Sequence, residues 1–289
     1  MKFGTSYAYW GTEWACDYEE IARRTAGIGF DLLEIGADHL YHMDEQEIKK
    51  LKELGEELGI SYITNSGPSK ENDLASEDLQ IREHGIAYFE KILRNMDRLG
   101  SRSLVGAIYS FWPADFSSTD KKGAWERSIA CLKKLSKTAE ELGIEIPLEV
   151  LNRNETYILT DCAEAIEYVG RIGSDKINIL LDTYHMNIEE DNMYDAIRKA
   201  GRLLGHLHVG ECNRKLPGMN NSIDWPEIGR ALRDIGYKKA VVMEPFLLTG
   251  GAVGHDVRVW RDLSNGASLE EMNRLIAESL AYLKACCLG

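Results

Sequence analysis

Four side chains that could bind a metal ion each follow a short apolar run of the sequence. They are Glu149, Asp182, His208 and Glu244. Each lies at or next to the last residue of a strand-like run, and helix-like sequence separates the runs. A polar residue after one strand is ordinary, but the same event on four successive strands is not. In a barrel of parallel strands all carboxyl ends meet in one ring, so these side chains would share one pocket.

The chemistry of such a pocket follows from the residue types. Three carboxylates and one imidazole repel one another unless a divalent cation lies between them. Oxygen-rich ligation with one imidazole suits Mn²⁺, Mg²⁺ or Co²⁺ better than structural zinc. A cation that holds adjacent hydroxyl and carbonyl oxygens of a neutral polyol acidifies the C–H on the hydroxyl-bearing carbon, and flanking carboxylates can move that proton. The pattern therefore predicts a metal-dependent enzyme.

Each of these residues also has an ordinary structural interpretation. Glu149 could form a salt bridge with Arg153 or a loop lysine, and Asp182 could cap a helix. His206 and His208 share one strand face because strand side chains alternate. We assign His208, which is nearer the strand end, as the ligand and His206 as a packed core histidine. The metal site is favoured because the four alternatives would have to coincide on consecutive strands.

Strand-like runs alternate with helix-like segments from end to end of the 289-residue chain. The strand-like runs are Phe3–Tyr9, Asp31–Ile35, Ile60–Thr64, Ser103–Ala107, Glu145–Leu151, Lys176–Leu181, Leu203–Val209 and Lys239–Met243. The helix-like segments are Asp17–Ile28, Asp44–Leu58, Ser76–Leu99, Gly123–Leu142, Asp161–Arg171, Met193–Ala200, Trp225–Ile235 and Leu269–Ala285. Such alternation predicts parallel strands with right-handed crossovers, and eight units close into a (β/α)8 TIM barrel. We expect one α/β catalytic domain over residues 1–289.

The alternative fold is an open doubly wound sheet. That fold usually carries a glycine-rich phosphate turn after its first strand, and Tyr7-Ala8-Tyr9-Trp10 is not such a turn. Polar segments follow the third, fourth and seventh strands and would border the catalytic face. They are Thr64–Ala75, Pro113–Lys122 and Asn213–Asp224.

Composition limits the partners. The formal net charge of −13 disfavours binding to nucleic acid or to acidic membranes. No apolar run reaches the length of a membrane span, and Met1-Lys2-Phe3-Gly4 enters a strand without a signal-like segment. The six cysteines lack C-x-x-C spacing, and Cys286 and Cys287 are adjacent. We expect reduced thiols in a cytoplasmic protein.

Several long motifs around the candidate ligands resemble the ketose 3-epimerase family. The motifs are Glu149–Arg153, Leu181–Asp191, Gly205–Arg214, Met243–Phe246 and Val259–Ala267. Named members of the family are D-tagatose 3-epimerase and D-allulose (D-psicose) 3-epimerase. The similarity extends from Tyr7-Ala8-Tyr9-Trp10 to the last helix, and long motifs in a fixed order are far more specific than one short pattern.

The resemblance implies roles for individual residues. Glu149, Asp182, His208 and Glu244 would hold one divalent metal per subunit, most often Mn²⁺, with Co²⁺ or Mg²⁺ as alternatives. Glu149 and Glu244 would also exchange protons on opposite faces of C3 through a cis-enediolate. Glu155, His185 and Arg214 match the family residues that bind the O1 and O2 end of the sugar. Trp112 and Phe246 match family residues that form apolar walls of the pocket. The family assembles as homodimers or homotetramers.

Taken without the family, some of these residues have other interpretations. Arg214 could be a solvated loop arginine, Trp112 a core aromatic residue, and His185 a buried hydrogen-bonding residue. Glu34, near the end of the second strand, could support the metal ligands or serve only the structure.

Three departures from the family pattern concern the choice of ketose. Ser6 stands where an aromatic residue is usual, Asn154 interrupts an Asn-Arg-Phe-Glu stretch, and Gly218–Asp224 replaces a Gly-x-Gly-Arg loop. None affects the four ligands or the acid/base pair. We expect a ketose 3-epimerase that interconverts D-fructose and D-allulose, with D-tagatose and D-sorbose as further substrates.

Three rival functions remain open at the level of sequence. An aldose–ketose isomerase or sugar-phosphate epimerase could use the same barrel, but a phosphate site requires basic residues after the last strands. Arg214 and Lys215 lie there, although Asp224 and the overall acidity oppose it. A DNA repair nuclease would need more histidines and a positive face. A non-catalytic sugar- or metal-binding regulator would not need paired glutamates.

Overall fold

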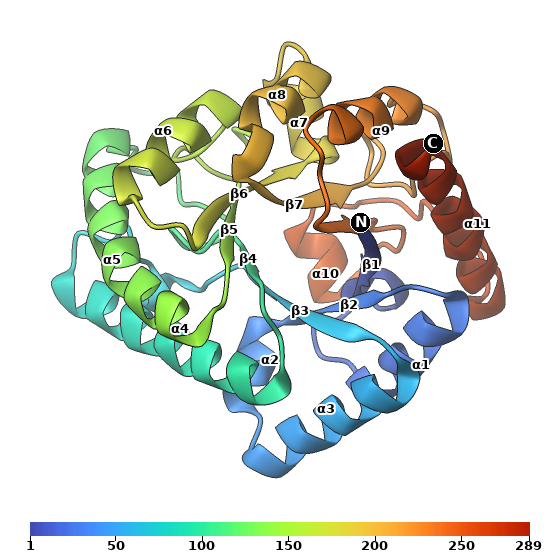
Figure 1. Cartoon of the computed structure of the whole chain (residues 1–289), viewed down its shortest axis with the longest axis horizontal. Coiled ribbons are helices and arrows are strands. Elements are labelled where there is room, and N and C mark those ends of the chain that lie inside the picture. Colours follow the sequence, from blue (N-terminus) through green and yellow to red (C-terminus); the bar gives the residue numbers. More distant parts are fainter.

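Eight parallel strands form a closed barrel at the centre of the molecule in the computed structural model, which describes residues 1–289 (Figure 1). The strands are β1 (Lys2–Ser6), β2 (Leu32–Gly36), β3 (Ser61–Ser66), β4 (Leu104–Gly106), β5 (Ile146–Glu149), β6 (Ile177–Asp182), β7 (Leu204–Val209) and β8 (Ala240–Met243). Each strand pairs with its neighbour in the chain, and β8 closes the ring against β1, with Lys2 opposite Ala240. The prediction of a (β/α)8 TIM barrel is confirmed.

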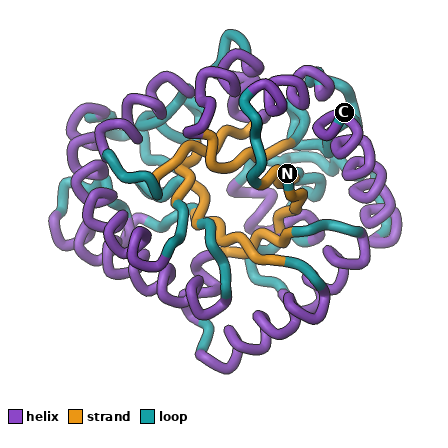
Figure 2. Tube along the Cα trace, viewed as in Figure 1, coloured by secondary structure: helices purple, strands orange, loops and turns teal.

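A ring of helices surrounds the strands (Figure 2). The outer helices are α1 (Tyr18–Ile28), α3 (Glu45–Leu58), α4 (Leu79–Leu99), α5 (Lys121–Leu142), α6 (Cys162–Ile172), α8 (Met193–Ala200), α9 (Trp225–Asp234) and α11 (Leu269–Leu288). Gly59, Gly100 and Gly143 end α3, α4 and α5 in the left-handed conformation, which glycine adopts without strain. At the start of α3, Asp44 forms a capping box with Glu47.

The structure shortens the first predicted strand and adds short helices that were not predicted. Tyr7–Tyr9 does not continue the first strand, because the Ser6 hydroxyl accepts the amide hydrogen of Ala8 and starts a 3-10 helix, η1 (Tyr7–Trp10). Short helices after three strands were not predicted: α2 (Ala37–His42), α7 (Thr183–Glu189) and α10 (Gly251–Asp256). Two further 3-10 turns are η2 (Lys70–Asn72) and η3 (Gly201–Leu203).

The interior of the barrel contains one apolar layer. It consists of Leu32, Ile63, Val105, Leu180 and Val242. These side chains come from five different strands, as expected for inward-facing positions in a TIM barrel. They close the barrel from within, so any pocket must lie above them, towards the carboxyl ends of the strands.

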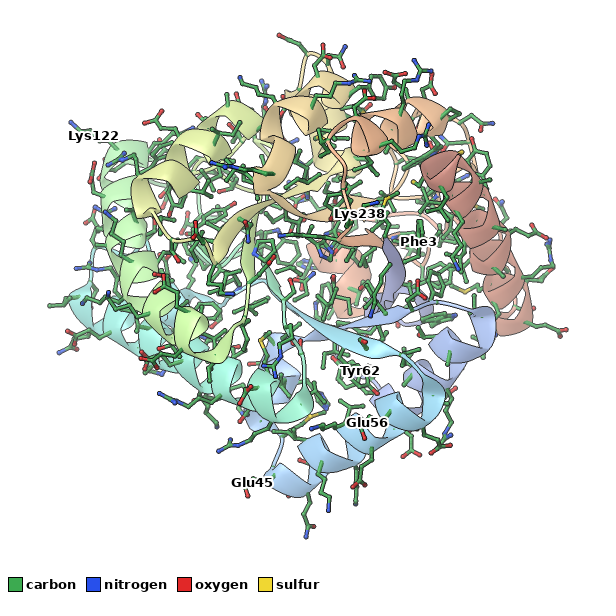
Figure 3. The ribbon with its side chains drawn as sticks, viewed as in Figure 1. Phe3, Glu45, Glu56, Tyr62, Lys122 and Lys238 are labelled. Carbon is green, nitrogen blue, oxygen red and sulfur yellow. The ribbon has the colours of Figure 1, made fainter.

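A larger apolar core fills the space between the strands and the helices. Tyr62 of β3 lies between the barrel and α3 (Figure 3), where a Cβ atom on Gly55 would lie only 2.6 Å from its ring. Glycine therefore allows α3 to approach the sheet. Charged side chains such as Glu45 and Lys122 are exposed on the outside of the helix ring (Figure 3). None of the helices combines the length and apolar composition needed to cross a membrane.

Candidate active site

The candidate ligands form the layer directly above the apolar layer. Successive strand side chains alternate, so the residue two positions after an inward-facing residue also faces inward. Asp182 follows Leu180 by two positions, and Glu244 follows Val242. The strand ends therefore convert an apolar interior into a polar mouth.

The four predicted metal ligands lie together. One ligand atom from each of Glu149, Asp182, His208 and Glu244 lies within 4.8 Å of the others. His208 Nδ1 is 3.4 Å from Glu149 Oε1 and 3.7 Å from Glu244 Oε2. Oxygen atoms and one imidazole nitrogen at this spacing match the donor set that a hard or borderline divalent cation requires.

The contacts of Arg153 and Asp182 decide between the metal-ligand interpretation and the ordinary interpretations of Glu149 and Asp182. Arg153 does not reach Glu149; its guanidinium pairs with Glu189, at 2.8 Å. Asp182 does cap α7, because its Oδ1 accepts the amide hydrogen of Tyr184 at 2.9 Å. Its Oδ2 faces the site instead, 3.7 Å from His185 Nε2. Asp182 thus combines helix capping with a place among the candidate ligands.

The electrostatics of the cluster also fit a cation. Burial raises the pKa of Glu244 to about 8, and the neighbouring Glu149 and Asp182 carboxylates add to the rise, although His208 and Arg214 oppose it. Burial alone would lower the pKa of His208, but the carboxylates around it raise that pKa well above its usual value. The protein by itself holds too much negative charge at this point, and a bound divalent cation would relieve it.

Arg214 lies inside the site. It is 4% exposed, so it is not a solvated loop arginine. Its Nη1 is 3.3 Å from Asp182 Oδ2 and 3.2 Å from Glu244 Oε2, and its Nη2 is 3.6 Å from Glu155 Oε1. Burial would raise the pKa of Glu155, but His185 and Arg214 hold it below its usual value. Arg214 is thus the cation that links the candidate ligands to the candidate sugar-binding residues.

A cavity of about 370 Å³ opens beside these residues, and all five predicted sugar-binding residues line it. They are Trp112, Glu155, His185, Arg214 and Phe246. Trp112 is half-buried, and its indole N–H donates to Glu155 at 2.8 Å, so it is a wall of the cavity with a polar anchor. His185 is buried and accepts the backbone N–H of Asn152 through Nδ1 at 3.1 Å. It therefore has both the hydrogen-bonding position and the cavity position that the sequence left open.

The three departures from the family pattern lie in different places. Ser6 lines the cavity, whereas Asn154 and the 218–224 segment do not. The segment is held from below by Glu211, which is fully buried and accepts hydrogen bonds from Gly218, Ser222 and Trp225. Of these departures, only Ser6 is in a position to contact a ligand in the cavity.

Sequence reasoning missed some polar residues near the site. Asn65 lines the cavity and donates to Glu34 Oε1 at 2.7 Å. Its position two residues after the inward-facing Ile63 is a signal that could have identified it. Asn152 and Glu211 lie in loops after β5 and β7, where strand alternation gives no guidance.

Comparison with known proteins identifies the family. Residues 22–286 match the model of the xylose isomerase-like TIM barrel family. The D-psicose 3-epimerase of Ruminiclostridium cellulolyticum is 46% identical over 283 residues, which are 98% of this chain and 96% of the relative. The enzyme of the same name from Agrobacterium fabrum is 42% identical over 98% of each chain. The chain belongs to the ketose 3-epimerase family.

Solved structures of other ketose 3-epimerases agree with this assignment. A crystal structure of D-psicose 3-epimerase in the presence of D-fructose has a TM-score of 0.98 and 41% identity, with full coverage of both chains. The D-psicose 3-epimerase of Clostridium cellulolyticum H10 with D-tagatose has the same TM-score and 44% identity over 99% of each chain. The prediction of an isomerase of the carbohydrate epimerase type is confirmed.

Proposed function

We propose that this ketose 3-epimerase inverts C3 of free ketohexoses, with D-fructose and D-allulose as its main pair and D-tagatose and D-sorbose as further substrates. One protein similar to this chain was crystallised in the presence of D-fructose and another with D-tagatose, which supports a ketohexose as the occupant of the cavity. The observation that carries the proposal is that three carboxylates and one imidazole lie within 4.8 Å of one another, and that two of the carboxylates, Glu149 and Glu244, line the cavity.

Glu149, Asp182, His208 and Glu244 would hold one divalent cation, Mn²⁺ in the first place and Co²⁺ or Mg²⁺ as alternatives. When bound, such a cation supplies Lewis acidity, which makes the hydrogen on C3 easier to remove and stabilises negative charge on the neighbouring oxygens. The ordinary interpretations of the four residues as separate caps or salt bridges do not account for their common position.

The acid/base chemistry belongs to two residues of the chain. Glu149 and Glu244 both line the cavity and approach His208 Nδ1 from different strands, β5 and the end of β8. One glutamate removes the C3 proton to give a cis-enediolate, and the other delivers a proton to the opposite face. Glu155, His185 and Arg214 hold the O1 and O2 end of the sugar, while Trp112 and Phe246 exclude water from the apolar side.

Exchange of the C3 hydrogen with deuterium from the solvent tests these roles. With Mn²⁺ added, the rates of C3 exchange and of epimerisation should each fall by about 10²–10⁴-fold in Glu149→Gln and in Glu244→Gln, because an amide cannot accept the proton. The matched control is Glu145→Gln, since Glu145 pairs with Lys239 away from the cavity. Exchange at the wild-type rate in both Glu149 and Glu244 variants would contradict the proposal.

A sugar-phosphate epimerase or an aldose–ketose isomerase is the alternative. The cavity lining opposes a phosphate, because it contains many carboxylates and a single guanidinium, that of Arg214. The acids that line it are Asp38, Glu149, Glu155, Glu244 and Asp256. Turnover of D-fructose should therefore far exceed turnover of fructose 6-phosphate, and faster conversion of the phosphate would favour the alternative.

We also propose a single catalytic domain over residues 1–289, assembly as a homodimer or homotetramer, and a cytoplasmic location. One barrel accounts for every strand and outer helix of the chain. The adjacent Cys286 and Cys287 suit reduced thiols rather than a disulfide. Light scattering coupled to gel filtration measures the assembly, and a monomer would contradict this part of the proposal.

A further inference from the structure

Glu34 is a carboxylate that the proposed reaction does not use. It lies in the middle of β2 and is fully buried. No lysine or arginine pairs with it; its hydrogen-bond contacts are with His208 and Asn65, and His206 Nε2 lies 3.4 Å from its Oε2 without forming a hydrogen bond. A buried carboxylate is costly without hydrogen-bond donors, so these contacts define its place in the molecule.

The two ring nitrogens of His208 face different carboxylates. Nε2 lies 3.1 Å from Glu34 Oε2, whereas Nδ1 lies 3.4 Å from Glu149 Oε1. A neutral imidazole carries its hydrogen on one nitrogen and a lone pair on the other. With Nε2–H donated to Glu34, the lone pair on Nδ1 faces the candidate ligands.

Asn65 extends the contact to the other side of the site. Its amide nitrogen donates to Glu34 Oε1 at 2.7 Å and lies 3.4 Å from Glu244 Oε1. One carboxylate thus orients His208 directly and Glu244 through Asn65. Metal-binding histidines commonly donate their second N–H to a carboxylate, which fixes the ring and strengthens the ligand.

We propose that Glu34 is a positioning residue of the metal site: it makes Nδ1 of His208 the ligand nitrogen and, through Asn65, holds Glu244 in place. The inference rests on the proposed function, because it requires a cation among Glu149, Asp182, His208 and Glu244. Glu34 does not line the cavity, so in this arrangement it acts on the reaction only through His208 and Glu244.

A rival arrangement uses the same residues differently. Glu34, His206 and His208 could themselves hold a cation, since their ligand atoms also lie within 4.8 Å of one another, and both ring nitrogens of His206 lack a hydrogen-bond partner. None of these three residues lines the cavity, however, whereas Glu149 and Glu244 do. A cation held there would not meet a ligand in the cavity, so we favour the positioning role.

Titration of the metal-free protein with Mn²⁺ alone distinguishes the positioning role from the rival cation site. Electron paramagnetic resonance detects the Mn²⁺ that remains free at each point of the titration. We expect Glu34→Ala to weaken Mn²⁺ binding by about 10–100-fold, and Glu34→Gln, which keeps the shape and one acceptor oxygen, to weaken it less. Glu145→Gln is the control and should bind as the wild type does. His206→Phe should leave the affinity within a few-fold of wild type, because His206 is not a ligand in this arrangement.

Each outcome bears on a different claim. If the wild type binds no Mn²⁺, the proposed metal site itself fails. If the wild type binds Mn²⁺ and both Glu34 variants bind it equally well, the positioning role is overturned. A loss in His206→Phe as large as that in Glu34→Ala would also overturn it, in favour of the rival cation site. Should Glu34→Ala not fold, Glu34→Gln decides, with several-fold weaker binding expected.

Discussion

Replacing Arg214 with Met tests whether this guanidinium balances the acids of the site. Its distances of 3.2, 3.3 and 3.6 Å to Glu244, Asp182 and Glu155 mean that the variant leaves three carboxyl groups, two of them buried and one partly buried, without their shared cation. Removing one partner of a buried ion pair costs about 3–5 kcal/mol. We therefore expect Arg214→Met to lower the free energy of unfolding of the metal-free protein by about that amount.

The same substitution should have a smaller effect once Mn²⁺ is bound. Arg214 and the cation neutralise the same carboxylates and repel each other, so loss of the arginine should tighten Mn²⁺ binding. The two effects are linked. If saturating Mn²⁺ reduces the loss of unfolding free energy in Arg214→Met by ~1.4 kcal/mol, the variant must bind Mn²⁺ about tenfold more tightly than the wild type. Arg214 would thus contribute to stability without being required for the metal.

Urea unfolding with and without Mn²⁺, together with Mn²⁺ titration, measures both effects. Arg153→Met is the matched control, because the Arg153 side chain that pairs with Glu189 is itself exposed to solvent, and its loss should cost about 1 kcal/mol. The reasoning is refuted if Arg214→Met and Arg153→Met destabilise the metal-free protein equally, or if Arg214→Met binds Mn²⁺ more weakly than the wild type.

Two further predictions concern pH and backbone geometry. Folding raises the pKa of Glu244 from 4.5 to about 8, so the folded, metal-free protein holds its proton more tightly than the unfolded chain. Its free energy of unfolding should therefore fall as pH rises from about 5 to 8, by at most ~1.4 kcal/mol per pH unit. In urea unfolding, Glu244→Gln should lack this pH dependence, and an unchanged dependence would contradict the prediction. Gly106→Ala should cost about 2–4 kcal/mol, because φ is +113° and the new Cβ would lie 2.3 Å from Ser66 O. Gly170→Ala, with open space around it in α6, should instead stabilise by about 0.5–1 kcal/mol, and equal effects of the two alanines would be inconsistent with this geometry.

The barrel could be predicted because its signals are local and repeated. Apolar runs alternate with amphipathic segments, and glycines such as Gly59 and Gly143 end helices where the periodicity ends. The short helices α2, α7 and α10 were missed because each is only six or seven residues long. Their existence depends on tertiary contacts and on caps such as Asp182, which from the sequence fits a metal ligand at a strand end and a helix cap equally well.

The site was predictable where one strand brings one residue to the barrel mouth. Alternation from an inward-facing residue such as Val242 leads directly to Glu244, and the position of Asp182 follows in the same way. Contacts between strands could not be predicted in this way. The place of Asn65 between Glu34 and Glu244 depends on the rotamers of three side chains, which no spacing in the sequence determines.

The most direct test of the account is anomalous diffraction at the manganese edge from crystals of the Mn²⁺-loaded protein. We expect one strong peak per chain, bounded by Glu149, Asp182, His208 and Glu244, with Nδ1 as the histidine ligand. The same peak should vanish in Asp182→Asn. A peak centred among Glu34, His206 and His208, or no peak at the barrel mouth in the wild type, would contradict it.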